Sequence, residues 1–116
     1  MNQEFVARWV AALRSGEYAQ TTGRLRDDAG YCCLGVAFDL LAKDGKGSWA
    51  GVSKEEGYIP SGYGETYVGL SLDRQDDLAA LNDNGATFAE LANHIERLAQ
   101  AANPNLPPLN EYGDEY

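Results

Sequence analysis

The sequence predicts an α+β fold with four helices around a central apolar helix and one or two small β-hairpins. Apolar residues recur at helical spacing in several segments, and the segment 32–43 is apolar on nearly all sides. Short alternating stretches bounded by turn residues predict the hairpins. The length of 116 residues suits one globular domain, which we expect over residues 1–103, followed by a Pro-rich acidic tail over residues 104–116.

The first predicted helix covers residues 3–14. Its apolar residues fall on one face: Phe5, Val6, Trp9, Val10 and Leu13. Arg14 in the last turn and Gly16 just beyond it are typical of a helix end. This stripe is therefore expected to pack on the core.

Residues 17–31 predict a loop with a short hairpin. Leu25 lies between Arg24 and Arg26, which is the alternation of a half-buried strand. The sequence Asp-Asp-Ala-Gly at 27–30 supplies turn residues, and Tyr31 would begin the return strand.

The central helix is predicted over residues 32–43, where Asp39 is the one acidic residue within the apolar run. Gly35 costs about 1 kcal/mol relative to alanine inside a helix. We expect it to allow another backbone to approach closely, with the first helix near Trp9 as the candidate.

Residues 44–70 are rich in glycine and aromatic side chains. They predict an irregular lobe with two short strands, around 58–59 and 66–68. Trp49, Tyr58, Tyr63 and Tyr67 make this lobe a candidate partner-binding surface, because rigid aromatic side chains are enriched at interfaces. The alternative is that the lobe only covers the core.

Two further helices follow. The third is predicted over 72–82 with Ser71 as N-cap, and with Leu72, Leu78 and Leu81 facing inward. The fourth opens with a Thr87-x-x-Glu90 capping box and carries the apolar residues Phe88, Leu91, Ile95 and Leu98.

Catalytic chemistry finds little support in the side chains present. Cys32 and Cys33 are adjacent and cannot form an unstrained disulfide, which favours a reducing cytoplasm. A nucleophilic thiol would need a base, and His94 is the single histidine. We expect buried structural cysteines, no catalytic residues, no metal site and no cofactor.

The loop Gly23-Arg24-Leu25-Arg26 allows two interpretations. Its backbone N–H groups and its two arginines, Arg24 and Arg26, could bind a nucleotide-like ligand, to sequester or hydrolyse it. It matches no P-loop or dinucleotide fingerprint. The other interpretation pairs these arginines with Asp27 and Asp28.

The net charge of −9 and the pI of about 4.4 argue against direct binding to nucleic acid or anionic membranes. No window holds the ~20 apolar residues of a membrane span. Residues 71–116 hold nine acidic and two basic side chains. Asp73, Asp76 and Asp77 share one face of the third predicted helix, and with the tail acids Glu111, Asp114 and Glu115 they could contact a basic partner or only keep the protein soluble.

Three sequence blocks resemble a family of small uncharacterised phage and prophage proteins. They are WVAALRSGEYAQ at 9–20, YCCLGV at 31–36 and LNDNGATFAELA at 81–92. The resemblance implies a phage or prophage origin and action in the cytoplasm of a bacterial host, and it brings no catalytic residue.

The sequence thus favours a small acidic binding protein over an enzyme. The leading hypothesis is inhibition of a host defence or nucleic-acid-handling protein, in the manner of an anti-CRISPR protein, by occupation of a basic surface. The alternative is the nucleotide-like ligand of the Arg24 and Arg26 loop. The partner's identity and the oligomeric state stay open.

Overall fold

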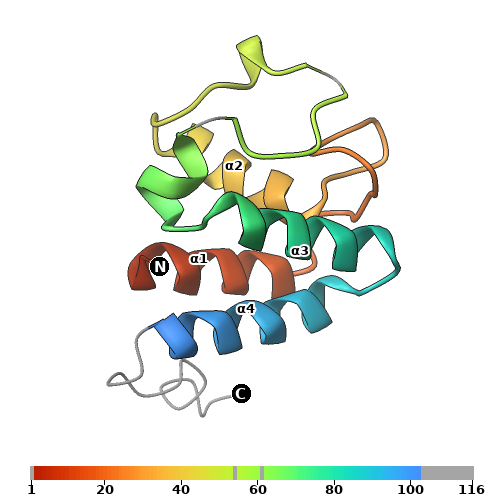
Figure 1. Cartoon of the computed structure of the whole chain (residues 1–116). Coiled ribbons are helices and arrows are strands. Elements are labelled where there is room, and N and C mark those ends of the chain that lie inside the picture. The colour runs from red at the N-terminus through yellow and green to blue at the C-terminus, as the bar shows by residue number, and fades with distance from the viewer. Residues whose placement is uncertain (1, 54, 61, 103–116) are drawn as a thin grey trace.

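A computed structural model describes residues 2–53, 55–60 and 62–102. Within these residues the chain is helical, as Figure 1 shows. The elements are α1 (Gln3–Arg14), α2 (Cys33–Lys43), a 3₁₀ turn η1 (Trp49–Gly51), a π-helical turn η2 (Gly64–Val68), α3 (Leu72–Asp83) and α4 (Phe88–Ala102). The tail 104–116 lies outside the described residues, so the domain boundary at 103 stays a prediction.

The predicted α+β class is wrong, because the described part of the chain contains no strand or sheet. In the 17–31 segment only isolated backbone pairings form, between Arg26 and Tyr31 and between Gln20 and Tyr31. The N–H of Cys32 donates to the Leu25 carbonyl at 3.0 Å, and the N–H of Leu25 donates to the Glu56 carbonyl at 2.7 Å. The backbone N–H and C=O groups of this loop thus form single hydrogen bonds with different segments, and no β-ladder forms.

The two short strands predicted in the 44–70 lobe are also absent. Residues 66–68 belong to η2, which is followed by Gly69 in the left-handed conformation with φ 76°. Ile59 is buried without strand pairing. The apolar side chains that suggested strands here are single anchors that hold an irregular lobe on the core.

The four predicted helices are present, and each packs against two of the others. Figure 1 shows α1 and α4 running antiparallel, with α3 above α1 and α2 behind α3. The α1–α4 contact is the most extensive, and α2 packs on both α1 and α3. All five apolar residues predicted to line the first helix are buried. Residues 33–41 of α2 are buried too, which confirms that this helix is central.

Gly35 makes the predicted close approach, but to a different segment. A Cβ at this position would collide with the carbonyl oxygen of Leu25, and not with α1. Leu25 is itself 1% exposed. Gly35 therefore allows the 17–31 loop to pack closely on α2. Leu25, whose alternation with Arg24 and Arg26 suggested a strand, is the buried residue at this contact.

The inward face of α3 differs from the prediction. Leu78 is buried, but Leu72 is 60% exposed and Leu81 is 39% exposed. The buried positions are filled instead by Gln75 and Asn82, which lie three residues before and four residues after Leu78 and so share its face. Two apolar side chains of α3 are consequently left at the surface.

The predicted helix caps are confirmed. The Ser71 hydroxyl accepts from the Arg74 N–H at 3.3 Å. At α4, the Glu90 N–H donates to the Thr87 hydroxyl at 3.1 Å, and the Thr87 N–H donates to the Glu90 carboxylate at 2.9 Å. The N-terminal ends of α3 and α4 are therefore both fixed by local side chains.

Candidate functional site

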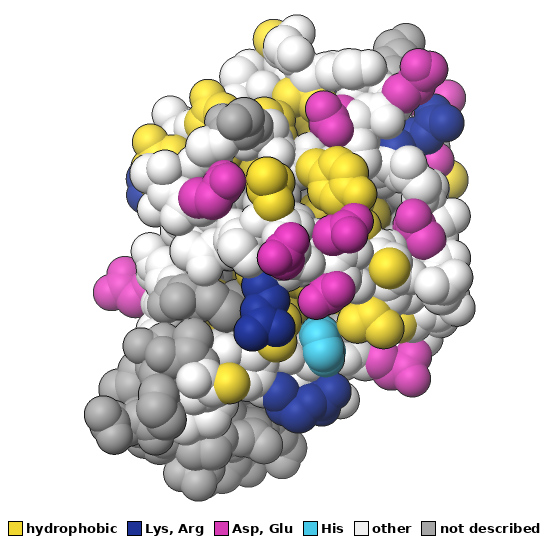
Figure 2. Space-filling model, viewed as in Figure 1, with side chains coloured by type: hydrophobic (Ala, Val, Ile, Leu, Met, Phe, Trp, Pro, Cys, Tyr) yellow, Lys and Arg dark blue, Asp and Glu magenta, His cyan; other side chains and the backbone are white. Residues whose placement is uncertain are grey.

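The outward side of α3 combines acidic and apolar side chains. We call this surface the α3 face, and it consists of Tyr58, Leu72, Asp73, Asp76, Asp77 and Leu81. Figure 2 shows several carboxylate side chains gathered with apolar ones over this helix. Tyr58, Leu72 and Leu81 are the large apolar side chains that stand out as exposed in the described part of the chain. Exposed apolar groups beside charged ones are typical of a protein-binding surface.

The carboxylates of the α3 face differ in their partners. Asp76 accepts a hydrogen bond of 2.7 Å from the Tyr58 hydroxyl. Among the described residues, Asp73 and Asp77 form no hydrogen bond or ion pair through their side chains. The carboxylates of Asp73, Asp76 and Asp77 lie three and four residues apart and repel one another. A basic group brought by another molecule would relieve that repulsion.

The four aromatic residues of the predicted partner-binding lobe separate into two groups. Trp49 and Tyr63 pack edge to face on Phe38, with ring centroids 4.9 Å and 5.7 Å away. Tyr67 packs beside Tyr63 at 6.1 Å. These three rings cover the core, whereas Tyr58 is 42% exposed and joins the α3 face. Of the four aromatic residues predicted to bind a partner, the structure thus places Tyr58 beside the acidic residues of α3.

Arg24 and Arg26 line a surface pocket of about 350 Å³ together with Asp27 and Asp28. The Arg26 guanidinium stacks over the Trp49 ring, 4.0 Å from its centroid. The N–H of Gly23, one of the loop donors considered for an anion, donates to the Asp83 carboxylate at 2.8 Å. Much of the loop's capacity for an anion is therefore used within the chain.

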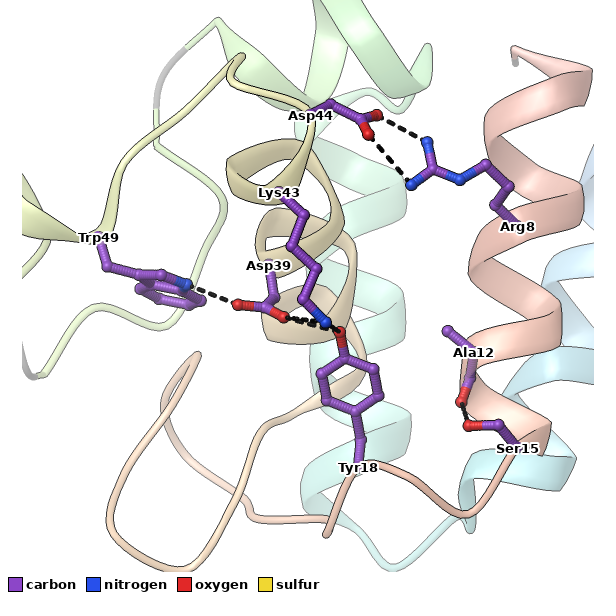
Figure 3. Close-up of polar contacts among 8 residues, drawn as sticks. All are labelled: Arg8, Ala12, Ser15, Tyr18, Asp39, Lys43, Asp44 and Trp49. Atoms are coloured by element: carbon purple, nitrogen blue, oxygen red, sulfur yellow. Dashed lines mark hydrogen bonds and ion pairs between the residues drawn. The ribbon is translucent and has the colours of Figure 1, made fainter.

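A polar cluster around Asp39 fastens the lobe to α2, as Figure 3 shows. The Asp39 carboxylate accepts from the Tyr18 hydroxyl at 2.7 Å and from the Trp49 indole N–H at 3.0 Å, and Lys43 lies 3.3 Å away. Burial raises the pKa of Asp39, but these hydrogen bonds outweigh it and hold the pKa below its ordinary value. The sequence signal for this cluster was the single carboxylate in an apolar helix.

The two cysteines are buried in the core. The Cys32 thiol caps α2 by accepting from the Gly35 N–H at 3.4 Å, and burial raises its pKa to about 11. Burial also raises the pKa of Cys33 well above its ordinary value. His94 lies on α4, where burial and the neighbouring Arg97 lower its pKa. No described side chain is placed to activate either thiol as a nucleophile.

We expect neither thiol to react with an alkylating or aromatic disulfide reagent in the folded protein at pH 7. The physical reason is that a pKa of about 11 for Cys32 leaves almost no thiolate at that pH. Thiol titration should detect two cysteines in denaturant and none over the same time without it. Rapid labelling of the native protein would show that the N-terminal end of α2 opens, and would bring back the nucleophile hypothesis.

Two classes of site are not found in the described residues. They contain no group of three or more histidine, cysteine, aspartate or glutamate side chains arranged to hold a metal ion. No helix among them has the length and apolar character required to cross a membrane.

Residues 1–65 match the family model described as a domain of unknown function, DUF8296. The chain belongs to this family. No curated protein and no solved structure is detectably similar to it. In this DUF8296 protein the match covers α1, the 17–31 loop and α2, whereas most of the α3 face lies beyond it.

Proposed function

We propose that this DUF8296 protein is a small acidic binding protein whose α3 face occupies a basic surface on a host protein. The observation that carries the proposal is the coincidence, on one helix, of exposed apolar side chains with carboxylates that have no ion pair within residues 2–53, 55–60 and 62–102. Clustered carboxylates compete with phosphate for a basic groove, because the same potential attracts both. We accordingly propose a host defence or nucleic-acid-handling protein as the partner.

The proposed setting is the cytoplasm of a bacterium, with a phage or prophage as the origin of the gene. The resemblance of three sequence blocks to phage and prophage proteins supports this origin. Inhibition in the manner of an anti-CRISPR protein would require only that the α3 face block the partner's nucleic-acid groove. The tail acids Glu111, Asp114 and Glu115 lie outside the described residues, and their participation is a further part of the hypothesis.

The alternative, a nucleotide-like ligand bound by Arg24 and Arg26, has less in its favour. The pocket of about 350 Å³ supports it. Against it stand the carboxylates of Asp27 and Asp28 in the same lining, which repel phosphate, and the stacking of Arg26 on Trp49. Thermal stabilisation by nucleotides would favour this alternative.

Changing Asp73, Asp76 and Asp77 together to Asn should weaken partner binding, mainly through the association rate. Steering by charge raises association rates, so we expect a loss of about tenfold at low salt and a shallower dependence on ionic strength. The fold should be unchanged or slightly more stable, since repulsion on α3 is relieved. Partners are first captured from host lysate at low salt, and the association rate is then measured by surface plasmon resonance.

A charge-matched control separates the α3 face from net charge. Glu4, Glu17 and Glu65 are exposed and lie elsewhere, so changing all three to Gln also removes three charges from the net −9, leaving −6. This control should bind the partner at the parental rate. If the α3 variant binds or inhibits as well as the parent at low salt, its carboxylates serve only solubility, and the function must be sought in another surface.

A further inference from the structure

A groove of about 400 Å³ adjoins the α3 face, between the C-terminal end of α3 and the outer side of α4. Leu81, Ala86 and Leu91 give it an apolar lining, and Glu90, His94 and Arg97 form its polar edge. Leu91 is fully buried beneath it, whereas Leu81 is 39% exposed. The groove therefore offers apolar contact to a side chain that enters from outside.

The groove and the acidic side chains form one continuous surface. Leu81 lines the groove and also lies four residues after Asp77, so the two share one side of α3. The charge of Asp77 acts on His94 across the α3–α4 contact. A molecule that contacts the Asp77 carboxylate is thus directly beside the groove.

The carboxylates on the α3 side of the groove favour a basic occupant there, whereas Arg97 on the α4 edge and Arg74 on α3 are the basic groups that act on His94. Burial lowers the pKa of His94, Arg97 and Arg74 lower it further, and Asp77 opposes them, so the imidazole is neutral at pH 7 and does not repel a cation. Asp73 and Asp77 have no side-chain ion pair among the described residues. The C-terminal turn of α3 holds no basic residue, and its dipole also favours positive charge.

We propose that this groove holds one apolar side chain of the partner protein, presented by an amphipathic basic segment whose lysines or arginines contact Asp73, Asp76 and Asp77. The inference rests on the proposed function and adds to it the chemistry of the partner. An amphipathic helix binds a groove through apolar anchors on one of its faces, while its charged residues contact the surface beside the groove. The groove supplies affinity, while the carboxylates supply association rate.

The test uses two synthetic helical peptides as probes. One is an amphipathic helix of lysine and leucine, and the other replaces each leucine with alanine at the same charge. The parent protein should bind the leucine peptide at least about tenfold more tightly at a fixed salt concentration. Leu81→Ser should remove this preference. The control Val52→Ser, at a half-buried residue of the 44–70 lobe that belongs neither to the groove nor to the α3 face, should retain it.

His94 gives a direct signal of occupancy, because it lines the groove and is the single histidine of the chain. Its imidazole resonances should shift more with the leucine peptide than with the alanine peptide at equal saturation, because both peptides neutralise Asp77 but only leucine enters the groove. Ala86→Leu fills the groove from within and should abolish the preference without removing apolar surface. The inference is overturned if either Leu81→Ser or Ala86→Leu, folded by circular dichroism, keeps the preference, or if the His94 resonances do not respond.

The same peptides distinguish a failure of this inference from a failure of the proposed function. The Asp73, Asp76 and Asp77 triple Asn variant should bind both peptides more weakly yet keep the preference for leucine. If the triple variant loses affinity but Leu81→Ser has no effect, the proposed acidic binding surface stands and the proposed role of the groove is wrong. If Leu81→Ser removes the preference but the triple variant binds like the parent, the groove binds the leucine and the proposed electrostatic function is wrong.

Discussion

Phe38→Ala should lower the free energy of unfolding by about 3–5 kcal/mol, a large part of the ~5–15 kcal/mol that a domain of this kind has. Phe38 is 1% exposed at the centre of α2. Its ring holds Trp49 and Tyr63 edge to face, so its removal leaves a cavity and also releases the lobe. Urea unfolding monitored by circular dichroism measures the change.

The matched control for this substitution is Leu72→Ala. Leu72 is a large apolar residue, but it is 60% exposed, so its truncation should change stability by about 0.5 kcal/mol or less. A loss below about 1 kcal/mol for Phe38→Ala would contradict the central position of α2.

Asn82→Ala should cost about 2–4 kcal/mol, although it removes a polar side chain. The Asn82 side chain, fully buried on α3, accepts from the Gln20 amide at 2.9 Å and from the Cys33 N–H at 3.2 Å, and it donates to the Thr21 carbonyl at 2.8 Å. Truncation leaves the buried Cys33 N–H without an acceptor and the half-buried Thr21 carbonyl without this donor, each at a cost of about 1–3 kcal/mol. Urea unfolding again measures the loss.

Hydrogen exchange adds a local test of the same contact. The Cys33 N–H should exchange faster in Asn82→Ala, because this N–H loses its acceptor at the start of α2. Asn84→Ala provides the control, since Asn84 is exposed in the turn after α3. If Asn82→Ala were as stable as Asn84→Ala, the three hydrogen bonds would contribute nothing, and α3 would be held by its other buried residues, Gln75 and Leu78.

The sequence predicted the helices well because their signals are local. Spacing of apolar residues found α1, and Ser71 and the Thr87–Glu90 box marked where α3 and α4 begin. The prediction of hairpins was wrong because a single buried residue such as Leu25, between two polar residues, produces the same alternation as a strand. Whether backbone groups pair in a ladder depends on distant segments, and the partner of the Leu25 N–H, the Glu56 carbonyl, lies 31 residues away.

The candidate site was predictable only in part, for a related reason. The charges of Asp73, Asp76 and Asp77 could be placed on one helix face by spacing alone. The exposure of Leu72 and Leu81 could not, because it follows from the burial of Gln75 and Asn82. The hydrogen bonds of Asn82 run to distant segments of the chain. The available signal was the position of Gln75 and Asn82 on the same helix face as Leu78. A pattern based on hydrophobicity assigns such polar residues to the surface.

The anchoring of α3 at both ends has a consequence for the cost of recognition. Ser71 fixes its first turn, and Asn82 ties its last turn to α2 and to the 17–31 loop. The backbone that carries the carboxylates is therefore already ordered before any partner arrives. Association then loses conformational entropy mainly from short aspartate side chains with few rotatable bonds, so the surface is preorganised and weak individual contacts suffice for binding.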